Sequence, residues 1–157
     1  MREKGFKSKC GMTLVEVMVS TMIILIAVIG IMYSYVKVIE MNSIGRDAGV
    51  AMRGLKDKIE EVKGSVFKDI PAVYNNSKFT INGLNGMGVI YVSSVLAPDA
   101  SISTHVWQVK GAYCWKLTGG RLIGEDKNLN GILDAGEDTN GNGQIDSYVQ
   151  IDTQIYG

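Results

Sequence analysis

The chain begins with polar and basic residues and then changes abruptly to an apolar run. From Val17 to Val36 no residue carries a charge, and Lys37 ends the run. About 20 residues of helix rise ~30 Å, which is roughly the hydrocarbon thickness of a bilayer. The run therefore predicts a membrane-spanning helix.

Beyond Lys37 the apolar residues recur at steps of three or four positions, from Val38 to Val66. This spacing places them on one face of an amphipathic helix, and the charged residues fall largely off that face. The two patterns together predict one helix from Met12 to about Lys63. Its first half is apolar all round, and its second half is apolar on one face only.

The pattern then changes to short strand-like runs, after a stretch at residues 65–76 that we expect to be a linking loop. Two pairs of these runs are separated by Gly-rich turns, which are hairpin signals. The predicted strands are Lys78–Asn82, Val89–Leu96, Ile102–Lys110, Ala112–Leu117, Arg121–Gly124 and Tyr148–Tyr156. The sequence thus predicts an α+β fold, with a long N-terminal helix packed on an antiparallel β-sheet.

Four basic residues lie in the first ten positions, and Gly11 follows them. A secretory signal peptide is cleaved after its apolar region, whereas the cleavage-like residue here precedes it. Cleavage after Gly11 would leave the apolar helix as the new N-terminus. Basic residues stay on the cytoplasmic side, which places the N-terminus inside and the C-terminal part outside. An uncleaved single-pass anchor with positive flanks is the alternative interpretation.

The stretch Gly11-Met12-Thr13-Leu14-Val15-Glu16 resembles the processing site of type IV prepilins and pseudopilins, which carry a class III signal peptide. In that family a basic leader ends in Gly, the next residue is usually Phe, and Thr-Leu-(Ile/Val)-Glu follows. Met12 in place of Phe is the one departure at the site. The stretch Leu55–Lys63 also resembles the helix end of V-type minor pilins and I-type pseudopilins, which favours a minor subunit.

The resemblance implies a pilin-like fold and a structural function in a type IV pilus or a type II secretion pseudopilus. A prepilin peptidase would cut after Gly11 and methylate Met12. The subunit would wait in the inner membrane, with its head outside, and then join other pilins or pseudopilins through its N-terminal helix at the inner-membrane assembly platform. The expected domains are a leader (1–11), a transmembrane half-helix (12–36), an amphipathic half-helix (37–64) and a β-rich head (65–157).

Glu16 is the acidic residue just inside the apolar run. A carboxylate in the apolar zone costs ~2–3 kcal/mol on insertion scales, and such residues are functional by default. One interpretation is that Glu16 lies about one turn from the interface and reaches it. The interpretation we favour is that it pairs with the ammonium group that cleavage creates on Met12, because a buried pair of this kind fixes the register of packed helices.

A second informative stretch lies at residues 126–146, where short oxygen-bearing side chains alternate along the chain. The first half matches the calcium-loop pattern D-x-[DN]-x-[DN]-G-x5-E at every position. Ca²⁺ takes six to eight oxygens, here from side chains, from one backbone carbonyl and from a closing bidentate Glu. The candidate ligands are Asp126, Asn128, Asn130, Ile132 (through its carbonyl), Asp134 and Glu137.

The same spacing repeats at once in a second loop, whose candidate ligands are Asp138, Asn140, Asn142, Gln144 and Asp146. This loop ends at Val149, where an acid is expected, so the sequence leaves it incomplete. Three interpretations stay open for it: weak binding, ligands shared with the first loop, or a plain turn. For both loops an Asx-rich hairpin without metal is the alternative. We expect a structural calcium loop inserted between strands and not an EF-hand helix pair.

Charge and chemistry exclude several other functions. The net charge is zero, and it falls to −3 without residues 1–11, so nothing indicates nucleic acid as a partner. Apart from Cys10 in the leader, His105 and Cys114 are the only His and Cys of the chain, and no catalytic spacing accompanies them, so we expect no enzyme. The competing hypothesis is a membrane-anchored calcium-binding module that never polymerises.

Overall fold

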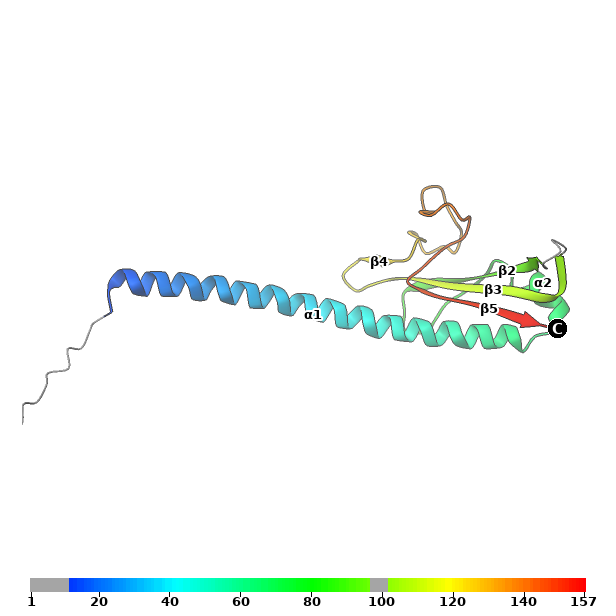
Figure 1. Ribbon diagram of the computed structural model, residues 1–157, viewed down its shortest axis with the longest axis horizontal. Helices are drawn as coiled ribbons and strands as arrows, with labels where there is room; N and C mark the ends of the chain where they lie inside the picture. The colour runs from blue at the N-terminus through cyan, green and yellow to red at the C-terminus, as the bar shows by residue number, and fades with distance from the viewer. Residues whose placement is uncertain (1–11, 97–101) are drawn as a thin grey trace, which may run out of the picture. The chain divides into compact units, whose positions relative to one another are not determined.

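The computed structural model describes residues 12–96 and 102–157 and divides the chain into two compact units, Met1–Asn42 and Ser43–Gly157. The leader 1–11, with Gly11, lies outside the described residues. Helix α1 (Leu14–Lys63) contributes to both units and confirms the predicted long N-terminal helix (Figure 1). It begins after Thr13, whose Oγ1 accepts a hydrogen bond from the amide of Glu16 at 3.2 Å, the first half of a capping box.

The first unit is the apolar part of α1. None of residues 12–42 is buried, and an 18-residue window of the helix reaches a mean hydropathy of 2.6. By length and composition this helix is able to cross a membrane. Its side chains therefore present apolar surface in every direction, as the sequence pattern predicts.

The second unit, which we call the head, is built on one antiparallel sheet of five strands. The path runs β1-β2-β3-β4, and β5 also pairs with β3. The strands are β1 (Ser77–Phe79), β2 (Gly86–Leu96), β3 (Ile102–Lys116), β4 (Leu122–Ile123) and β5 (Val149–Tyr156). Both β4 and β5 bond to the same edge of β3, at its end and along its middle, so the segment that joins them leaves and re-enters the sheet there.

The main core lies between one face of this sheet and the part of α1 that belongs to the head. Ala51, Leu55, Ile59 and Val62 are buried at helical spacing, which confirms the amphipathic second half of the helix. They pack with apolar residues from α2 and the sheet: Ile70, Ile90, Val92, Val109, Tyr113, Trp115, Val149 and Ile155. The α+β architecture predicted from the sequence is therefore present in the head.

The opposite face of the sheet carries a second, smaller core. Val89 and Cys114 alternate with the residues of the main core, so they point to the other side. There they meet Ile145, Leu129 and Leu133 from the segment between β4 and β5. The Asp/Asn-rich loops are thus packed on the sheet face that the helix leaves open.

Two predicted elements differ from the structure. Residues 65–76 are not only a loop, because they contain the 3-10 turn η1 (Phe67–Asp69) and the short helix α2 (Ile70–Tyr74). Pro71 lies in the first turn of α2, where its missing N–H leaves no hydrogen bond unmade. The runs 102–110 and 112–117 are one strand, β3, because Gly111 continues the ladder with Ile90 and Ile151 instead of ending it.

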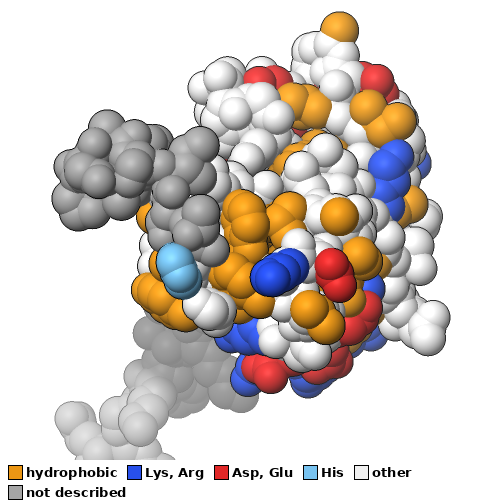
Figure 2. Space-filling view, turned by 90° about the vertical axis from the view of Figure 1, so that its right-hand side faces the viewer, with side chains coloured by type: hydrophobic (Ala, Val, Ile, Leu, Met, Phe, Trp, Pro, Cys, Tyr) orange, Lys and Arg blue, Asp and Glu red, His pale blue; other side chains and the backbone are white. Residues whose placement is uncertain are grey.

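The surface of the head mixes charged and apolar side chains. Figure 2 shows hydrophobic groups interspersed with Lys, Arg, Asp and Glu on one of its faces. Val66, Val73 and Tyr156 are among the large apolar residues that the head leaves exposed. Their exposed fractions of 60–71% contrast with the fully buried residues of the main core.

Candidate functional site

The residues of the expected processing and assembly site lie at the start of α1. Met12 precedes the helix and is exposed, and Glu16 is exposed in its first turn. An acidic residue in the first turn is stabilised by the helix dipole and by free N–H groups. Gly11, after which cleavage is expected, lies outside the described residues.

The Asp/Asn-rich segment forms two irregular loops between β4 and β5, and residues 124–148 contain no helix. The predictions that the segment is inserted between strands and that helices do not flank it are both confirmed. The positive backbone angles repeat with a period of 12 residues. The pairs are Gly124 and Gly136, Leu129 and Gly141, and Gly131 and Gly143. The two loops therefore repeat each other in backbone conformation as well as in sequence.

In the first loop the side chains predicted as ligands turn inward. Both carboxylate oxygens of Asp126 accept backbone hydrogen bonds, from Asn130 N at 3.2 Å and from Gly131 N at 2.7 Å. Asp134 Oδ2 accepts from the side-chain amides of Asn128 and Asn130 at 2.7 and 2.9 Å. The structure therefore brings four of the predicted ligands together.

The other two predicted ligands of this loop, Glu137 and Ile132, differ in burial. Glu137 is 4% exposed, and its carboxylate accepts backbone amides of the same loop, Lys127 N at 2.8 Å and Asp134 N at 3.1 Å. Ile132, whose carbonyl is the expected ligand, keeps an exposed side chain. Its amide donates to Asn130 Oδ1 at 2.6 Å.

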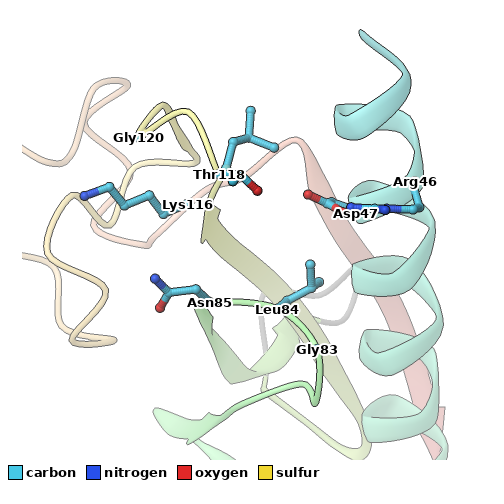
Figure 3. A pocket seen from close by; sticks show the side chains of 9 residues that line it. Arg46, Asp47, Gly83, Leu84, Asn85, Lys116, Thr118 and Gly120 are labelled. Carbon is cyan, nitrogen blue, oxygen red and sulfur yellow. Dashed lines mark hydrogen bonds and ion pairs between the residues drawn. The ribbon is translucent and has the colours of Figure 1, made fainter. Parts of the chain in front are cut away.

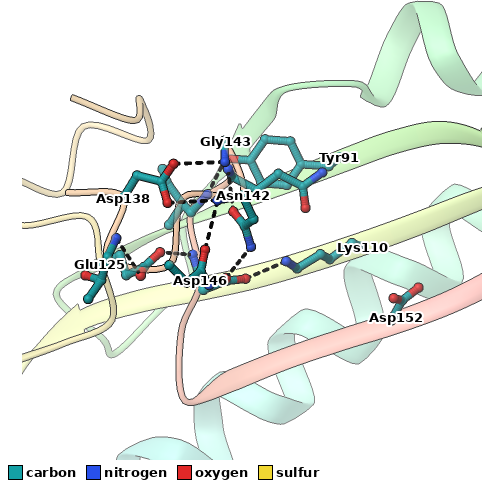
Figure 4. A network of polar contacts seen from close by, with 12 residues as sticks. Tyr91, Lys110, Glu125, Asp138, Asn142, Gly143, Asp146 and Asp152 are labelled. Carbon is teal, nitrogen blue, oxygen red and sulfur yellow. Dashed lines mark hydrogen bonds and ion pairs between the residues drawn. The ribbon is translucent and has the colours of Figure 1, made fainter. Parts of the chain in front are cut away.

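The second loop reproduces these contacts with exposed partners. Asp138 accepts from Asn142 N at 3.1 Å and from Gly143 N at 2.9 Å. Asp146 Oδ2 accepts from the side-chain amides of Asn140 and Asn142 at 2.5 and 2.6 Å. Two of the predicted ligands, Asn140 and Asn142, thus converge on Asp146 at the ninth position, and Figure 4 shows Asp138, Asn142 and Asp146 in this loop.

Gln144, the predicted carbonyl ligand of the second loop, matches Ile132 of the first. Its amide donates to Asn142 Oδ1 at 2.8 Å, as the Ile132 amide donates to Asn130 Oδ1. The neighbouring residue Ile145 is buried, and its amide donates to the hydroxyl of Tyr91 at 2.9 Å. Gln144 therefore lies in a stretch of backbone that the sheet holds in place.

The chemistry of the donor set fits a hard cation such as Ca²⁺. Asp126 and Glu137 are the buried charged residues of the described chain, and in that part no Lys or Arg forms an ion pair with either one. Buried charges in proteins are usually paired or coordinate a metal, because desolvation without a partner is costly. Among the described residues no group of three or more His, Cys, Asp or Glu side chains is placed to hold a metal ion. Asn side chains make up part of each predicted donor set.

The second loop has a cationic neighbour on the sheet. Lys110 Nζ of β3 forms an ion pair with Asp146 Oδ1, and both side chains are less than 20% exposed. Burial raises the pKa of Asp146, but hydrogen bonds from Lys110, Asn140 and Asn142 outweigh it and hold that pKa below its ordinary value. The Lys110 contact uses one carboxylate oxygen, and the amide contacts use the other.

Sequence reasoning missed one residue of this segment. Glu125 Oε1 and Oε2 accept the amides of Thr139 and Asp146, both in the second loop. A signal was present in the sequence, because Gly-Glu-Asp occurs at 124–126 and again at 136–138, so the repeat begins before Asp126. The motif, which starts at its first Asp, did not include it.

Elsewhere in the head, a cleft of about 560 Å³ lies between α1 and two turns of the sheet. Figure 3 shows Arg46 and Asp47 on the helix side and Leu84, Asn85 and Thr118 on the turns. No His or Cys is among its described lining residues.

The residues considered as catalytic candidates both lie on β3. His105 is exposed, whereas Cys114 is fully buried under the second loop, where its thiol contacts the carbonyl of Asp146 at 3.7 Å. Burial raises the pKa of the Cys114 thiol, which disfavours the reactive thiolate. Cys114 is thus a packing residue of the smaller core.

Comparisons with known proteins add no further identification. No family model, no curated protein and no solved structure matches this chain.

Proposed function

We propose that this chain is a structural subunit of a type IV pilus or of a type II secretion pseudopilus, of the minor kind. The observation that carries the proposal is the order of features at the N-terminus. A basic leader ends in Gly11, Met12 to Glu16 follow with the prepilin pattern, and a charge-free helical run comes next.

The exposed surface of the apolar part of α1 supports this proposal. The apolar part of α1 is exposed all round, so lipid or other helices of the same kind are needed to cover it. Its hydropathy suits the inner membrane before assembly and the packed centre of a filament afterwards. The N-terminus is then cytoplasmic and the head lies outside.

Within this function we assign the Asp/Asn-rich segment a structural role as a calcium clamp. When bound, Ca²⁺ would supply the positive charge that the buried carboxylates Asp126 and Glu137 lack. Asn128, Asn130 and Asp134 would hold it with side-chain oxygens, and Ile132 with its carbonyl. The clamp would fix the segment that connects β4 to β5.

The experiment that tests the filament proposal is the mass of the N-terminal peptide, from membranes that also contain an active prepilin peptidase. We expect a peptide that begins at Met12 and is heavier by one methyl group. A membrane sample with inactive peptidase is the control and should retain Met1 or Arg2.

An intact N-terminus despite active peptidase would contradict the proposal. The chain would then be an uncleaved, membrane-anchored calcium-binding module, and Glu16 would have no ammonium group to pair with. The measurement does not depend on calcium, so it tests the filament assignment separately from the clamp.

A further inference from the structure

Strand β5 has one paired edge and one free edge. Among the described strands it pairs only with β3, and its register along β3 is unbroken. The ladder continues to Gly157, whose amide donates to the carbonyl of His105 at 3.1 Å. In an antiparallel pair, residues that bond to the partner strand alternate with residues whose N–H and C=O groups point away from it. The outward-pointing groups of β5 are therefore those of Gln150, Asp152, Gln154 and Tyr156.

The two faces of β5 differ in burial. Val149 and Ile155 are buried in the main core, and Ile151 packs against it, so the odd-numbered residues face α1. The even-numbered residues, which carry the outward-pointing backbone groups, are all exposed on the other face. A strand placed beside β5 would thus meet free backbone donors and acceptors next to an exposed polar surface.

The opposite edge of the sheet is protected. Strand β1 has only three residues, and exposed Lys78 is the middle one. Beyond β1, the amide of Val92 on β2 donates to the side chain of Asn75 at 3.0 Å. Short strands, Lys residues and covering groups are the devices by which natural edge strands avoid pairing with another chain. By contrast, β5 has eight residues, contains no Lys or Pro and pairs with β3 without a bulge.

Asp152 is the single charged residue of β5. Its carboxylate accepts the side-chain amide of Gln108 on β3 at 3.0 and 3.2 Å. Asp152 lies opposite Lys110 in the ladder, but the ammonium group of Lys110 forms its ion pair with Asp146 (Figure 4). In the described part of the chain none of the ion pairs includes Asp152. The middle of the free edge therefore carries a negative charge.

The charge of this region indicates which kind of strand fits the edge. Residues 125–157 contain seven Asp and Glu residues and a single Lys. A second copy of the chain would bring the same acidic residues to the shared edge, and like charges on neighbouring strands are destabilising. A strand with Lys or Arg beside Asp152 would instead gain a favourable cross-strand pair. The occupant that fits is therefore a basic segment of another protein.

We propose that the free edge of β5 binds an extended basic segment of a partner protein, which adds to the sheet as a further strand. The outward-pointing backbone groups of β5 supply the hydrogen bonds, and Asp152 selects Lys or Arg in the partner. The site uses residues of the head alone, so it does not depend on cleavage after Gly11. It adds a binding surface to the structural function proposed above.

The experiment is fluorescence anisotropy of a labelled synthetic peptide, Ser-Lys-Val-Lys-Thr-Lys-Val-Ser, titrated with the full-length chain in micelles of an uncharged detergent. In an antiparallel strand the Lys side chains would lie on the face of Asp152, and the Lys backbone groups would bond to β5. The control peptide has the same sequence with N-methylated Lys amides, which keeps the charges and removes those donors. We expect the control peptide to bind about tenfold more weakly.

Two variants test the location of the site. Asp152→Lys should weaken binding of the Lys peptide about tenfold and should favour the same peptide with Glu in place of Lys. Gln154→Pro removes an N–H that points away from β3, so it should block the added strand and keep the ladder with β3. Glu60→Lys makes the same charge change at an exposed residue of α1 and, at physiological ionic strength, should bind like the parent.

Four results would overturn the inference. One is that the Lys peptide does not bind the parent chain, and another is that the N-methylated peptide binds equally well. A third is binding that stays unchanged in both Asp152→Lys and Gln154→Pro. The fourth is a dimer of the parent chain, measured by sedimentation and lost in Gln154→Pro, which would assign the edge to a second copy. If Gln154→Pro fails to fold, Asp152→Lys and the N-methylated peptide still decide.

Discussion

Gly111 of β3 lies so close to Leu55 of α1 that a Cβ added to Gly111 would be 2.7 Å from Leu55 Cδ1. The same added atom would be 3.0 Å from Ile90 Cδ1. These neighbours belong to the main core and are fully buried. The glycine is therefore what allows the helix to approach the middle of the sheet.

We expect Gly111→Ala to lower the free energy of unfolding by ~1–3 kcal/mol, because an extra methyl group overpacks a filled core. Urea unfolding of the detergent-solubilised chain, followed by tryptophan fluorescence, measures it. Gly119→Ala is the control, since a Cβ there meets nothing within 4 Å. Equal stability of the two variants would show that the helix does not pack this closely.

This glycine also shows what the sequence could predict and what it could not. The long helix, the hairpins and β5 could be predicted from local periodicity and turn residues, because these signals lie in residues that are close together in the sequence. Gly111 looks like a strand break in sequence, and only its distant neighbours Leu55 and Ile90 explain why a strand continues through it. Local patterns do not contain that information.

In the Asp/Asn-rich loops, too, some features could be predicted from the sequence and others could not. The candidate ligands of the first loop could be named from the sequence because the calcium-loop pattern spans 12 consecutive residues. The contacts of Glu125 with Thr139 and Asp146 could not be predicted, because they arise only when the second loop folds back. Val149 appeared to make that loop incomplete, and the structure supplies the reason: the position belongs to β5.

The hydroxyl of Tyr91 attaches the second loop to β2, since it accepts the amide of buried Ile145 at 2.9 Å. Tyr91→Phe keeps the ring and leaves that amide without its partner. We expect a loss of ~1–3 kcal/mol in the free energy of unfolding, the usual cost of a buried unsatisfied donor. Tyr148→Phe is the control, because Tyr148 is 80% exposed, and a loss of equal size there would contradict the assignment.

Two tyrosines of the head should ionise late in an alkaline titration. Burial raises the pKa of Tyr91 and of Tyr113 above 10.0, their ordinary value. A raised pKa in the folded state means that the neutral form is favoured by folding. The stability that these groups contribute is complete below about pH 10 and is lost as the pH rises through their folded pKa values.

Absorbance of the phenolate in the ultraviolet measures this titration. We expect Tyr91 and Tyr113 to ionise only above pH 10, together with the onset of unfolding. In denaturant, where their burial is lost, Tyr91 and Tyr113 should ionise near their ordinary pKa. Ionisation of Tyr91 and Tyr113 near pH 10 in the folded chain would contradict their burial.

The calcium role proposed for the Asp/Asn-rich segment predicts that removal of calcium loosens the cover over Cys114. This thiol is fully buried beneath Ile145 and the carbonyl of Asp146. At calcium ten times above its Kd, an ion bound in the first loop should add ~1.4 kcal/mol to stability, which corresponds to about tenfold in the population of the open state. Thiol modification of Cys114 should therefore be about tenfold faster in a chelator than in calcium.

A chain that begins at Met12 suits this measurement, because it lacks Cys10 and reports on Cys114 alone. Magnesium is the control ion, since it prefers strict octahedral sites and should protect the thiol less than calcium does. Equal rates with calcium, with magnesium and with chelator would contradict the clamp.

The proposed assembly role of Glu16 depends on the charge of its carboxylate. It lies in the first turn of α1, next to a run without charge, and its carboxylate is exposed in the isolated chain. Glu16→Gln keeps the size and the polar character of the side chain but removes the charge that would pair with the Met12 ammonium. Membrane insertion depends on the apolar run and should be unchanged.

We expect Glu16→Gln to reach the membrane in normal amount and to be depleted from filaments, measured as the ratio of subunit in the sheared filament fraction to subunit in the membrane. Glu60→Gln changes an acid of the same helix within the head and should assemble normally, which controls for expression and stability. The depletion follows because packed apolar helices exclude water, and an unpaired ammonium there is costly. Normal incorporation of Glu16→Gln would leave the interfacial position of Glu16 as the better explanation of its place in the sequence.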